Sequence, residues 1–218
     1  MNSKYKVLKF KSNNFKNVDD LVSIEEPLEI SIKYKNNDKW VTQILSITMR
    51  TPGHDEDLVR GFLFNEQIVQ DVKHIQSIKS FGAKVGQYKI QNKILATLNN
   101  SKNINITKIK RDFLTNSSCG VCGKSSLDAL EIIKTKKPSL AEPKMKNLNP
   151  KKQFIACSGR LNFELVQKVL MTNIGIMIGV GAPTSLAIDL ANKYNMTLVG
   201  FVKKESFNIY SNKQKIII

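Results

Sequence analysis

Two of the three cysteines in this 218-residue chain stand close together, as Cys119-Gly-Val-Cys122. They lie in a Ser- and Gly-rich segment, directly before a helix that we expect to begin near Ser125 or Ser126. Unpaired N–H groups at a helix start and the adjacent Lys124 both stabilise a thiolate, which is the form of cysteine that attacks sulfur. The flanking glycines leave room for a bulky partner or cofactor. The pair is the strongest candidate for chemistry in this sequence.

Four interpretations of the cysteine pair remain open from the residues alone. A structural zinc site needs four ligands, and the other candidates, Cys157, His54 and His74, are scattered along the chain. A thioredoxin-type redox centre has the same spacing but normally follows the first strand of a βαβ unit. The two cysteines could also be inert. In the fourth interpretation one cysteine carries a persulfide, and the other helps to release or pass on the sulfur.

The composition narrows the class of protein. Thirty-four basic against 18 acidic residues give a net charge of +16, which suggests an anionic partner, although generic solvation of a Lys- and Asn-rich surface explains it equally well. Aromatic residues make up only 7%, and no nucleic-acid-binding motif is present, so we expect no specific nucleic-acid partner. An odd, sparse set of cysteines disfavours a disulfide framework. The longest apolar stretch, 174–180, is too short to cross a membrane, and the N-terminus lacks an apolar signal core, so we expect a cytoplasmic protein.

The elements before the cysteine pair read as mostly β-structure, giving a β-rich part over 1–112 with one helix. We expect residues 1–20 to form a loosely attached arm, 28–34 and 40–47 to form a hairpin, and 72–98 to hold two or three short strands. A helix is predicted from Thr51 as its cap and Pro52 as its first residue, with Leu58, Phe62 and Leu63 as its apolar face. His54 is a candidate general base, although its place beside this helix start favours a capping or structural role.

Residues 113–135 carry the cysteine loop and its helix, and the Lys- and Pro-rich stretch 136–152 reads as a linker. The last part, 153–218, alternates strand and helix, which predicts parallel strands with right-handed crossovers. Ligands of open parallel sheets bind beyond the carboxyl ends of the strands. Here those ends are Ser158-Gly-Arg160 and Gly181-Ala-Pro-Thr184, whose N–H groups could hold an anion beside the Arg160 guanidinium. They could also be no more than compact turns.

An ordered set of segments resembles the FdhD/NarQ family of formate dehydrogenase accessory sulfurtransferases. These segments span residues 24–212 and are Glu25-Glu-Pro-Leu-Glu-Ile30, Met49-Arg-Thr-Pro-Gly-His-Asp55 with Gly61-Phe-Leu63, Ser118-Cys-Gly-Val-Cys-Gly123, Ser158-Gly-Arg160 with Phe163-Glu164 and Gln167-Lys168, Ala182-Pro-Thr-Ser-Leu-Ala187, Leu198-Val-Gly-Phe201, and Phe207-Asn-Ile-Tyr210. The family segments that normally lie between the cysteine helix and Phe154 are absent, and the Lys-rich stretch 136–152 stands in their place.

The resemblance implies an α/β fold, α+β overall, with a shortened cytidine-deaminase-like parallel-sheet core and a β-rich N-terminal part. It also implies a sulfur carrier that takes persulfide sulfur from a cysteine desulfurase and delivers it to the molybdenum cofactor of formate dehydrogenase. Cys119 would carry the persulfide with Cys122 as its partner, and no metal site or permanently bound cofactor would belong to the protein itself. The cargo is molybdenum bis(molybdopterin guanine dinucleotide).

By the same resemblance the cofactor would lie against Phe207, Asn208, Ile209, Tyr210, Ser211 and Asn212. Ser158 and Arg160 would hold its phosphates, and Phe207 or Tyr210 could stack on guanine. The family also suggests a homodimer. The alternatives are an inactive shortened relative that acts as a binding module, or a redox or zinc protein built on the cysteine pair.

Overall fold

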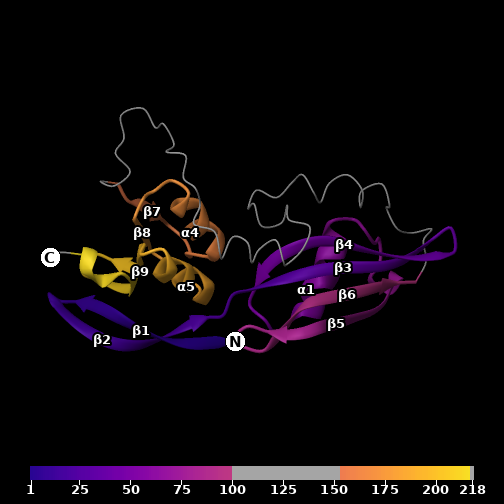
Figure 1. The fold of residues 1–218 in the computed structure, drawn as a ribbon, viewed down its shortest axis with the longest axis horizontal. Helices are drawn as coiled ribbons and strands as arrows, with labels where there is room; N and C mark the ends of the chain where they lie inside the picture. The colour runs from indigo at the N-terminus through magenta and orange to yellow at the C-terminus, as the bar shows by residue number, and fades with distance from the viewer. Residues whose placement is uncertain (100–152, 217–218) are drawn as a thin grey trace. The chain divides into compact units, whose positions relative to one another are not determined.

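Two β-sheets organise the protein in its computed structural model, which describes residues 1–99 and 153–216 (Figure 1). The described residues divide into two compact units, one built from 1–25 with 153–216 and the other from 26–99. The predicted cysteine loop and helix (113–135) and the Lys-rich linker (136–152) lie outside the described residues. No helix in the described ranges is long and apolar enough to cross a membrane.

The first unit is a six-stranded sheet in the order β2-β1-β10-β9-β8-β7. Its strands are β1 (Asn2–Lys11), β2 (Asn14–Ser23), β7 (Ile155–Cys157), β8 (Ile176–Gly179), β9 (Thr197–Lys203) and β10 (Ser206–Ser211), and its helices are α4 (Phe163–Leu170), α5 (Ser185–Lys193) and the short η4 (Lys213–Lys215). Strands β7, β8 and β9 are parallel, and β10 returns antiparallel to β9. The predicted strand–helix alternation of the last part is confirmed, and the mixed sheet agrees with an α/β class.

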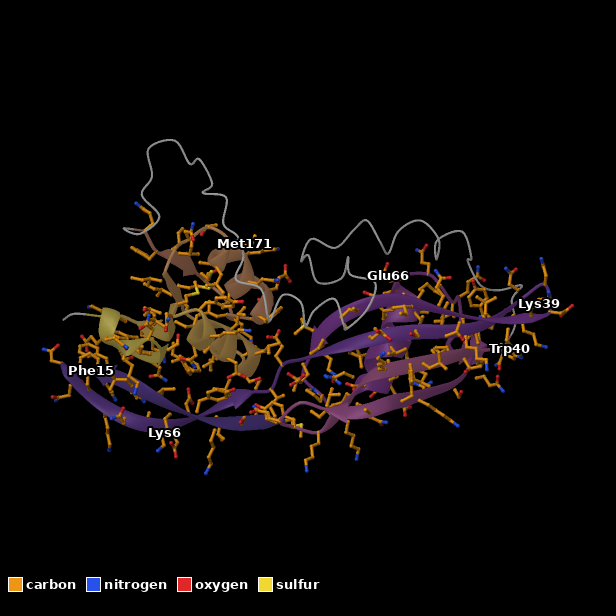
Figure 2. All side chains as sticks on the ribbon, viewed as in Figure 1. Lys6, Phe15, Lys39, Trp40, Glu66 and Met171 are labelled. Atoms are coloured by element: carbon orange, nitrogen blue, oxygen red, sulfur yellow. The ribbon has the colours of Figure 1, made fainter. Side chains whose placement is uncertain are left out.

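The prediction of a loose N-terminal arm is wrong. Residues 2–23 form an antiparallel hairpin of two ten-residue strands, and β1 pairs with β10 from Leu8 opposite Ile209 to Lys11 opposite Ser206. The high Lys and Asn content conceals the apolar residues that the hairpin buries, since Val7 and Val22 are in the core while Lys4, Lys6 and Lys9 are exposed. Figure 2 shows Lys6 and Phe15 on this hairpin. The part predicted over 1–112 is therefore divided after Glu25, because the hairpin belongs with the C-terminal sheet.

The second unit is a four-stranded sheet in the order β4-β3-β6-β5. It contains β3 (Glu26–Asn36), β4 (Lys39–Arg50), β5 (Ile75–Val85), β6 (Ile90–Leu98), α1 (Asp55–Asn65) and the short η1 (Val72–His74). The predicted hairpin is confirmed: Asn37 and Asp38 both have positive φ, 47° and 62°, the conformation that two-residue hairpin turns require. Val59 and Leu63 of α1 join the buried core that includes Ile30, Ile32 and Ile94 of the sheet.

Helix α1 begins later than the sequence predicts. It starts at Asp55 rather than near Thr51, and His54 occupies the N-cap position without a side-chain capping bond. The acids predicted for the first turn are there, but the buried face is Val59 and Leu63, and Leu58 is exposed.

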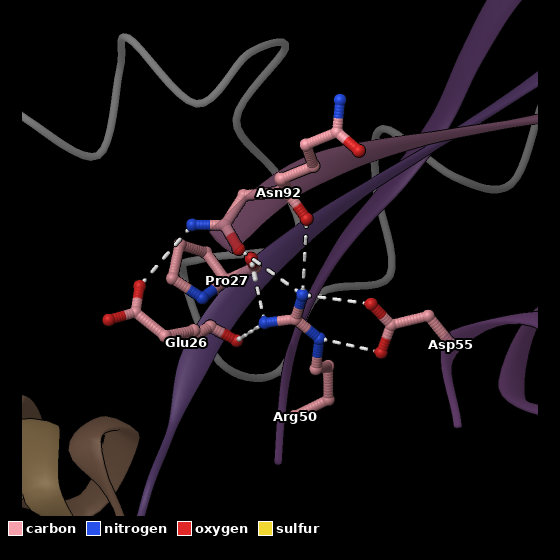
Figure 3. Close-up of polar contacts among 6 residues, drawn as sticks. Glu26, Pro27, Arg50, Asp55 and Asn92 are labelled. Carbon is pink, nitrogen blue, oxygen red and sulfur yellow. Dashed lines mark hydrogen bonds and ion pairs between the residues drawn. The ribbon is translucent and has the colours of Figure 1, made fainter. Parts of the chain in front are cut away.

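The late start follows from a buried arginine at the end of β4 (Figure 3). Both Arg50 Nε and Nη2 lie 2.9 Å from the Asp55 carboxylate, and Nη1 donates to the carbonyl oxygens of Glu26 and Pro27. Nη2 also donates to Asn92 Oδ1 at 3.2 Å. Because the guanidinium fork fixes Asp55 in place, residues 51–54 form a turn, and the His54 side chain is 91% exposed. His54 therefore occupies the N-cap position, in agreement with the predicted place at the helix start, and its carbonyl oxygen accepts the Leu58 N–H, but its side chain does not cap the helix.

Candidate functional site

The two turns predicted at the carboxyl edge of the parallel strands lie side by side. Gly181 N–H donates to the Gly159 carbonyl at 3.1 Å, and Leu161 N–H donates to the Ala182 carbonyl at 3.1 Å. The Thr184 N–H donates to the Leu161 carbonyl at 3.0 Å, which adds a third backbone hydrogen bond between the two segments. The turns thus continue the parallel ladder beyond β7 and β8, and they bring Ser158 and Arg160 next to the residues that start α5. Both Ser158 and Arg160 are exposed.

Close backbone packing holds the turns together. A Cβ atom added to Gly181 would stand 2.7 Å from the Gly159 carbonyl oxygen and 2.9 Å from the Arg160 nitrogen, both of them backbone atoms. The same addition at Gly159 would meet nothing within 4 Å. Glycine at 181 is therefore a packing requirement, whereas Gly159 borders open space.

A buried carboxylate joins the starts of both helices to the end of the N-terminal hairpin. Glu25 Oε2 accepts the Phe163 N–H of α4 at 2.9 Å and the Thr184 hydroxyl at 2.6 Å, and the Glu25 N–H donates to Ser185 Oγ at 3.0 Å. Only 6% of Glu25 is exposed. A negative charge at a helix start is favourable because it meets unpaired N–H groups and the positive end of the helix dipole.

The sequence led us to expect that an anionic ligand could bind at this helix start. In the structure, the Glu25 carboxylate of the protein itself accepts the first N–H group of α4. A second first-turn donor, Leu165 N–H, is taken by the Asn162 side chain at 3.0 Å. Two N–H groups at the start of α4 are therefore already bonded within the protein. The exposed Arg160 guanidinium is the group left at this edge for a phosphate.

Burial raises the pKa of the Glu25 carboxyl above its ordinary value. The hydrogen bonds from Thr184 and Phe163 and the positive charge of Arg160 lower the pKa, but less than desolvation raises it. The raised pKa shows that the fold holds a carboxyl group in a site that disfavours its charge, and that neighbouring donors offset part of this cost.

The six residues predicted along β10 do not gather at one place. Ile209, Tyr210 and Ser211 are buried, and the Phe207 ring stacks on Phe10 at 4.9 Å between centroids. Asn208 lies opposite Gly200, one strand away from the Gly181 turn. Asn212 lies at the other edge of the sheet, where its side chain donates to the Asn195 carbonyl at 2.5 Å.

Two of the buried residues of β10 have structural partners. Tyr210 donates its hydroxyl hydrogen to Asp20 of β2 at 2.5 Å, and burial together with this bond raises the pKa of Tyr210 above its ordinary value. Ser211 Oγ accepts the Leu198 N–H and donates to the Met196 carbonyl, which closes the irregularity in the β9–β10 pairing. These contacts bind β10 to its neighbours and leave Tyr210 and Ser211 little surface for a ligand.

Phe201 is an aromatic residue at the carboxyl edge to which the sequence analysis assigned no role. Its φ is +53°, a left-handed conformation that is unusual for a bulky side chain, and 38% of it is exposed. The Phe201 N–H donates to the Gly181 carbonyl at 3.2 Å, so the residue is tied to the turn beside Arg160. Strained backbone of this kind clusters at binding sites. In the sequence, the only indication of a role for Phe201 is its place in the motif Leu198-Val-Gly-Phe201.

The predicted catalytic pair, Cys119 and Cys122, lies outside the described residues. Cys157, at the end of β7, is a free and half-buried thiol. Within 1–99 and 153–216, no group of three or more His, Cys, Asp or Glu side chains is arranged to hold a metal ion.

Comparison with known proteins identifies the family. The model of the FdhD/NarQ family matches residues 23–148 and 144–217. A protein of Sulfurisphaera tokodaii named Sulfur carrier protein FdhD is 32% identical over 97% of this chain and 98% of its own length. Proteins of the same name from Sulfolobus acidocaldarius and Picrophilus torridus are 29% and 30% identical, over 98% and 92% of this chain and 98% and 93% of their own lengths. The chain belongs to the FdhD/NarQ family.

The alignments also bear on the length of the chain. The alignment to the S. tokodaii protein runs over 267 positions, more than the 218 residues here, so that relative carries residues within the aligned region that this chain lacks. The two stretches matched by the family model meet at residues 144–148, in the Lys-rich stretch. That this stretch replaces family core segments stays a prediction.

Replacing Glu25 tests the buried carboxylate. Because burial raises its pKa above 4.5, the folded protein binds this proton more tightly than the unfolded chain, so stability falls as the pH rises from below 4.5 through the raised pKa. Glu25→Gln keeps an oxygen acceptor but does not titrate. We therefore expect the stability of wild type relative to Glu25→Gln to decrease between pH values below 4.5 and neutral pH, measured by circular dichroism melts.

The matched control is Glu205→Gln, at an exposed carboxylate. Its difference from wild type should stay constant over the same range. If the Glu25→Gln difference is equally constant, Glu25 does not carry a disfavoured charge in the folded protein.

Proposed function

We propose that this protein is a sulfur carrier, in which Cys119 holds a persulfide and Cys122 assists its release. The observation that carries the proposal is membership of the FdhD/NarQ family, whose relatives bear the name sulfur carrier protein, in a chain that contains the Cys119-Gly-Val-Cys122 pair. Lys124 supports it, because a nearby positive charge lowers the pKa of a thiol and increases the thiolate fraction.

The transfer is a thiol–disulfide type of exchange. The Cys119 thiolate attacks the outer sulfur of a persulfide on a cysteine desulfurase. A new sulfur–sulfur bond forms, the old one breaks, and the desulfurase cysteine leaves as a thiolate. The Cys122 thiolate then attacks the inner sulfur of the Cys119 persulfide, which releases hydrosulfide and leaves a Cys119–Cys122 disulfide. A cellular dithiol reductant returns the pair to the reduced form.

The proposed acceptor is the molybdenum cofactor of formate dehydrogenase, a bis(molybdopterin guanine dinucleotide), which this protein would bind as a substrate. Its pyrophosphates suit the exposed guanidinium of Arg160 and the hydroxyl of Ser158 at the carboxyl edge. Neither group is tied into the contacts that close the turns.

The guanine ring of the cofactor would stack on Phe201 more readily than on Phe207 or Tyr210, the aromatic residues predicted on β10. Phe201 is exposed and bonded to the Gly181 turn, whereas Tyr210 is buried on Asp20 and Phe207 is stacked on Phe10. In this proposal Asn208 lies opposite Gly200, the residue before Phe201. Ile209, Tyr210, Ser211 and Asn212 hold the strand in place.

Removing single cysteines tests the carrier. After incubation with a cysteine desulfurase and cysteine, we expect mass spectrometry of alkylated protein to find a persulfide on wild type and on Cys122→Ala, and none on Cys119→Ala. Cys157→Ala is the matched control and should label like wild type. A persulfide on Cys122 in the Cys119→Ala variant would assign the carrier to the other cysteine, and stoichiometric zinc in the purified protein would favour a metal site instead.

Removing Phe201 tests the nucleotide site. Because base–aromatic stacking is worth about 1–3 kcal/mol, Phe201→Ala should weaken binding of GDP roughly 5-fold or more, measured by isothermal titration calorimetry. Phe154→Ala, at another exposed phenylalanine, should bind like wild type. Unchanged binding by Phe201→Ala, with loss of binding by Phe207→Ala, would return the guanine site to β10.

A further inference from the structure

The end of the β3–β4 hairpin carries an exposed tryptophan beside two lysines. Trp40, the one tryptophan of the chain, is 47% exposed, and Figure 2 shows it next to Lys39 at this end of the hairpin. The Nζ atoms of Lys33 and Lys35 lie 5.2 Å and 5.5 Å from the centroid of the Trp40 ring. Tryptophan is enriched among the residues that dominate protein–protein binding. The hairpin end is therefore a candidate interaction surface.

The strand register places these side chains on one face of the four-stranded sheet. Lys35 lies opposite Trp40, and Lys33 lies opposite Thr42. Alternate residues of a strand point to the same face, so Ile44 lies on this face as well, and it is 42% exposed. Helix α1 packs on the opposite face, where the buried core of this unit lies. Among the described residues of the unit, no α-helix covers the face that carries Trp40.

The Trp40 ring holds the two ammonium groups in position. Cations are attracted to the negative face of an aromatic ring, and this attraction offsets the repulsion between two lysines that are close together. A free lysine side chain loses rotamer freedom when it binds, so an ammonium group that is already ordered binds a carboxylate at a lower entropic cost. A carboxylate placed between Lys33 and Lys35 also relieves their mutual repulsion. The two lysines are thus arranged for an acidic ligand.

The surroundings of the two lysines favour a ligand with both acidic and apolar side chains. Residues 33–44 hold three lysines and one acidic residue, Asp38, so positive charge is in excess at the hairpin end. The exposed side chains of Trp40 and Ile44 add apolar surface beside this charge. Exposed apolar surface next to charge of one sign is typical of a protein-binding site, and complementary charge selects the partner.

Two other kinds of anionic partner fit this surface less well. Single-stranded nucleic acid stacks successive bases on aromatic rings, but the Trp40 ring already holds two ammonium groups. Phe81, the other exposed aromatic residue of the four described strands, lies on β5 at the far edge of the sheet. A membrane would meet the turn of the hairpin first, and this turn is polar, with the sequence Asn36-Asn-Asp38.

We propose that Lys33, Lys35, Trp40 and Ile44 form a docking surface for an acidic segment of another protein. Carboxylates of that segment bind the two ammonium groups, and an apolar side chain of the segment covers Ile44 and the exposed part of Trp40. The surface goes beyond the proposed function, because it lies in the second unit and needs neither the cysteine pair nor the carboxyl edge of the parallel strands.

The fluorescence of Trp40 tests the docking surface in the full chain. We expect a short peptide of alternating glutamate and leucine to shift the tryptophan emission to shorter wavelength and to bind more weakly as salt is added. Lys33→Glu combined with Lys35→Glu should raise the dissociation constant roughly 10-fold or more. The matched control, Lys84→Glu combined with Lys89→Glu, makes the same change of net charge at exposed lysines of the β5–β6 hairpin and should bind like wild type.

A second variant tests the apolar part of the surface by isothermal titration calorimetry. Ile44→Ser should weaken binding of the glutamate–leucine peptide and leave binding of a glutamate–serine peptide of the same length unchanged. Because the substituted side chains are exposed or half-buried, circular dichroism melts of all variants should match those of wild type.

An unshifted emission spectrum at millimolar peptide would overturn the proposal. So would equal weakening by the two double variants, because net charge and not this surface would then govern binding. Tighter binding of oligothymidylate or of phosphatidylglycerol vesicles than of the peptide, lost when Lys33 and Lys35 are replaced, would assign the surface to nucleic acid or to a membrane instead.

Discussion

The buried carboxylate of Glu25 is the interaction on which the candidate site depends. It stands where the N-terminal hairpin ends, and it meets the Phe163 N–H, the Thr184 hydroxyl and, through its own backbone, Ser185. One residue thus ties the hairpin to the starts of both helices and to the turn between β8 and α5. Burying a charge is costly unless hydrogen bonds replace its water. The raised pKa of Glu25 is the sign that this replacement is incomplete.

The contacts of Glu25 determine which groups at the carboxyl edge of the parallel strands remain for a ligand. Since Glu25 and Asn162 already accept two N–H groups at the start of α4, this helix start has fewer donors left for a ligand. Arg160 supplies positive charge, and Phe201 supplies an aromatic face held in a strained left-handed conformation next to Gly181. A guanidinium and an aromatic ring at the same sheet edge are the groups that a nucleotide bearing phosphates would need. The net charge of +16 favours such an anionic substrate in addition.

Elements that depend on neighbouring residues could be predicted from the sequence, whereas the pairing of segments far apart in the chain could not. The alternation of strands and helices after residue 153 and the turn at Asn37–Asp38 were readable because each depends on neighbouring residues. The pairing of β1 with β10 joins Leu8 to Ile209, across most of the chain, and no local pattern among the lysines and asparagines of residues 1–20 reveals it. The start of α1 was misplaced because the cap pattern at Thr51 is overridden by the Arg50–Asp55 contact. At the candidate site, the positions of Arg160 and Ser158 at the strand ends could be predicted from the sequence, whereas the contacts of Glu25 and Phe201 arise only once distant segments meet.

The central claim is that this chain carries sulfur on Cys119 for a molybdenum enzyme. Its most direct test is the formate dehydrogenase activity of a bacterial strain that lacks its own accessory protein and expresses this chain instead. The account predicts that wild type and Cys157→Ala restore the activity and that Cys119→Ala does not. Restoration by Cys119→Ala to the wild-type level, or no restoration by well-expressed wild type, would contradict it.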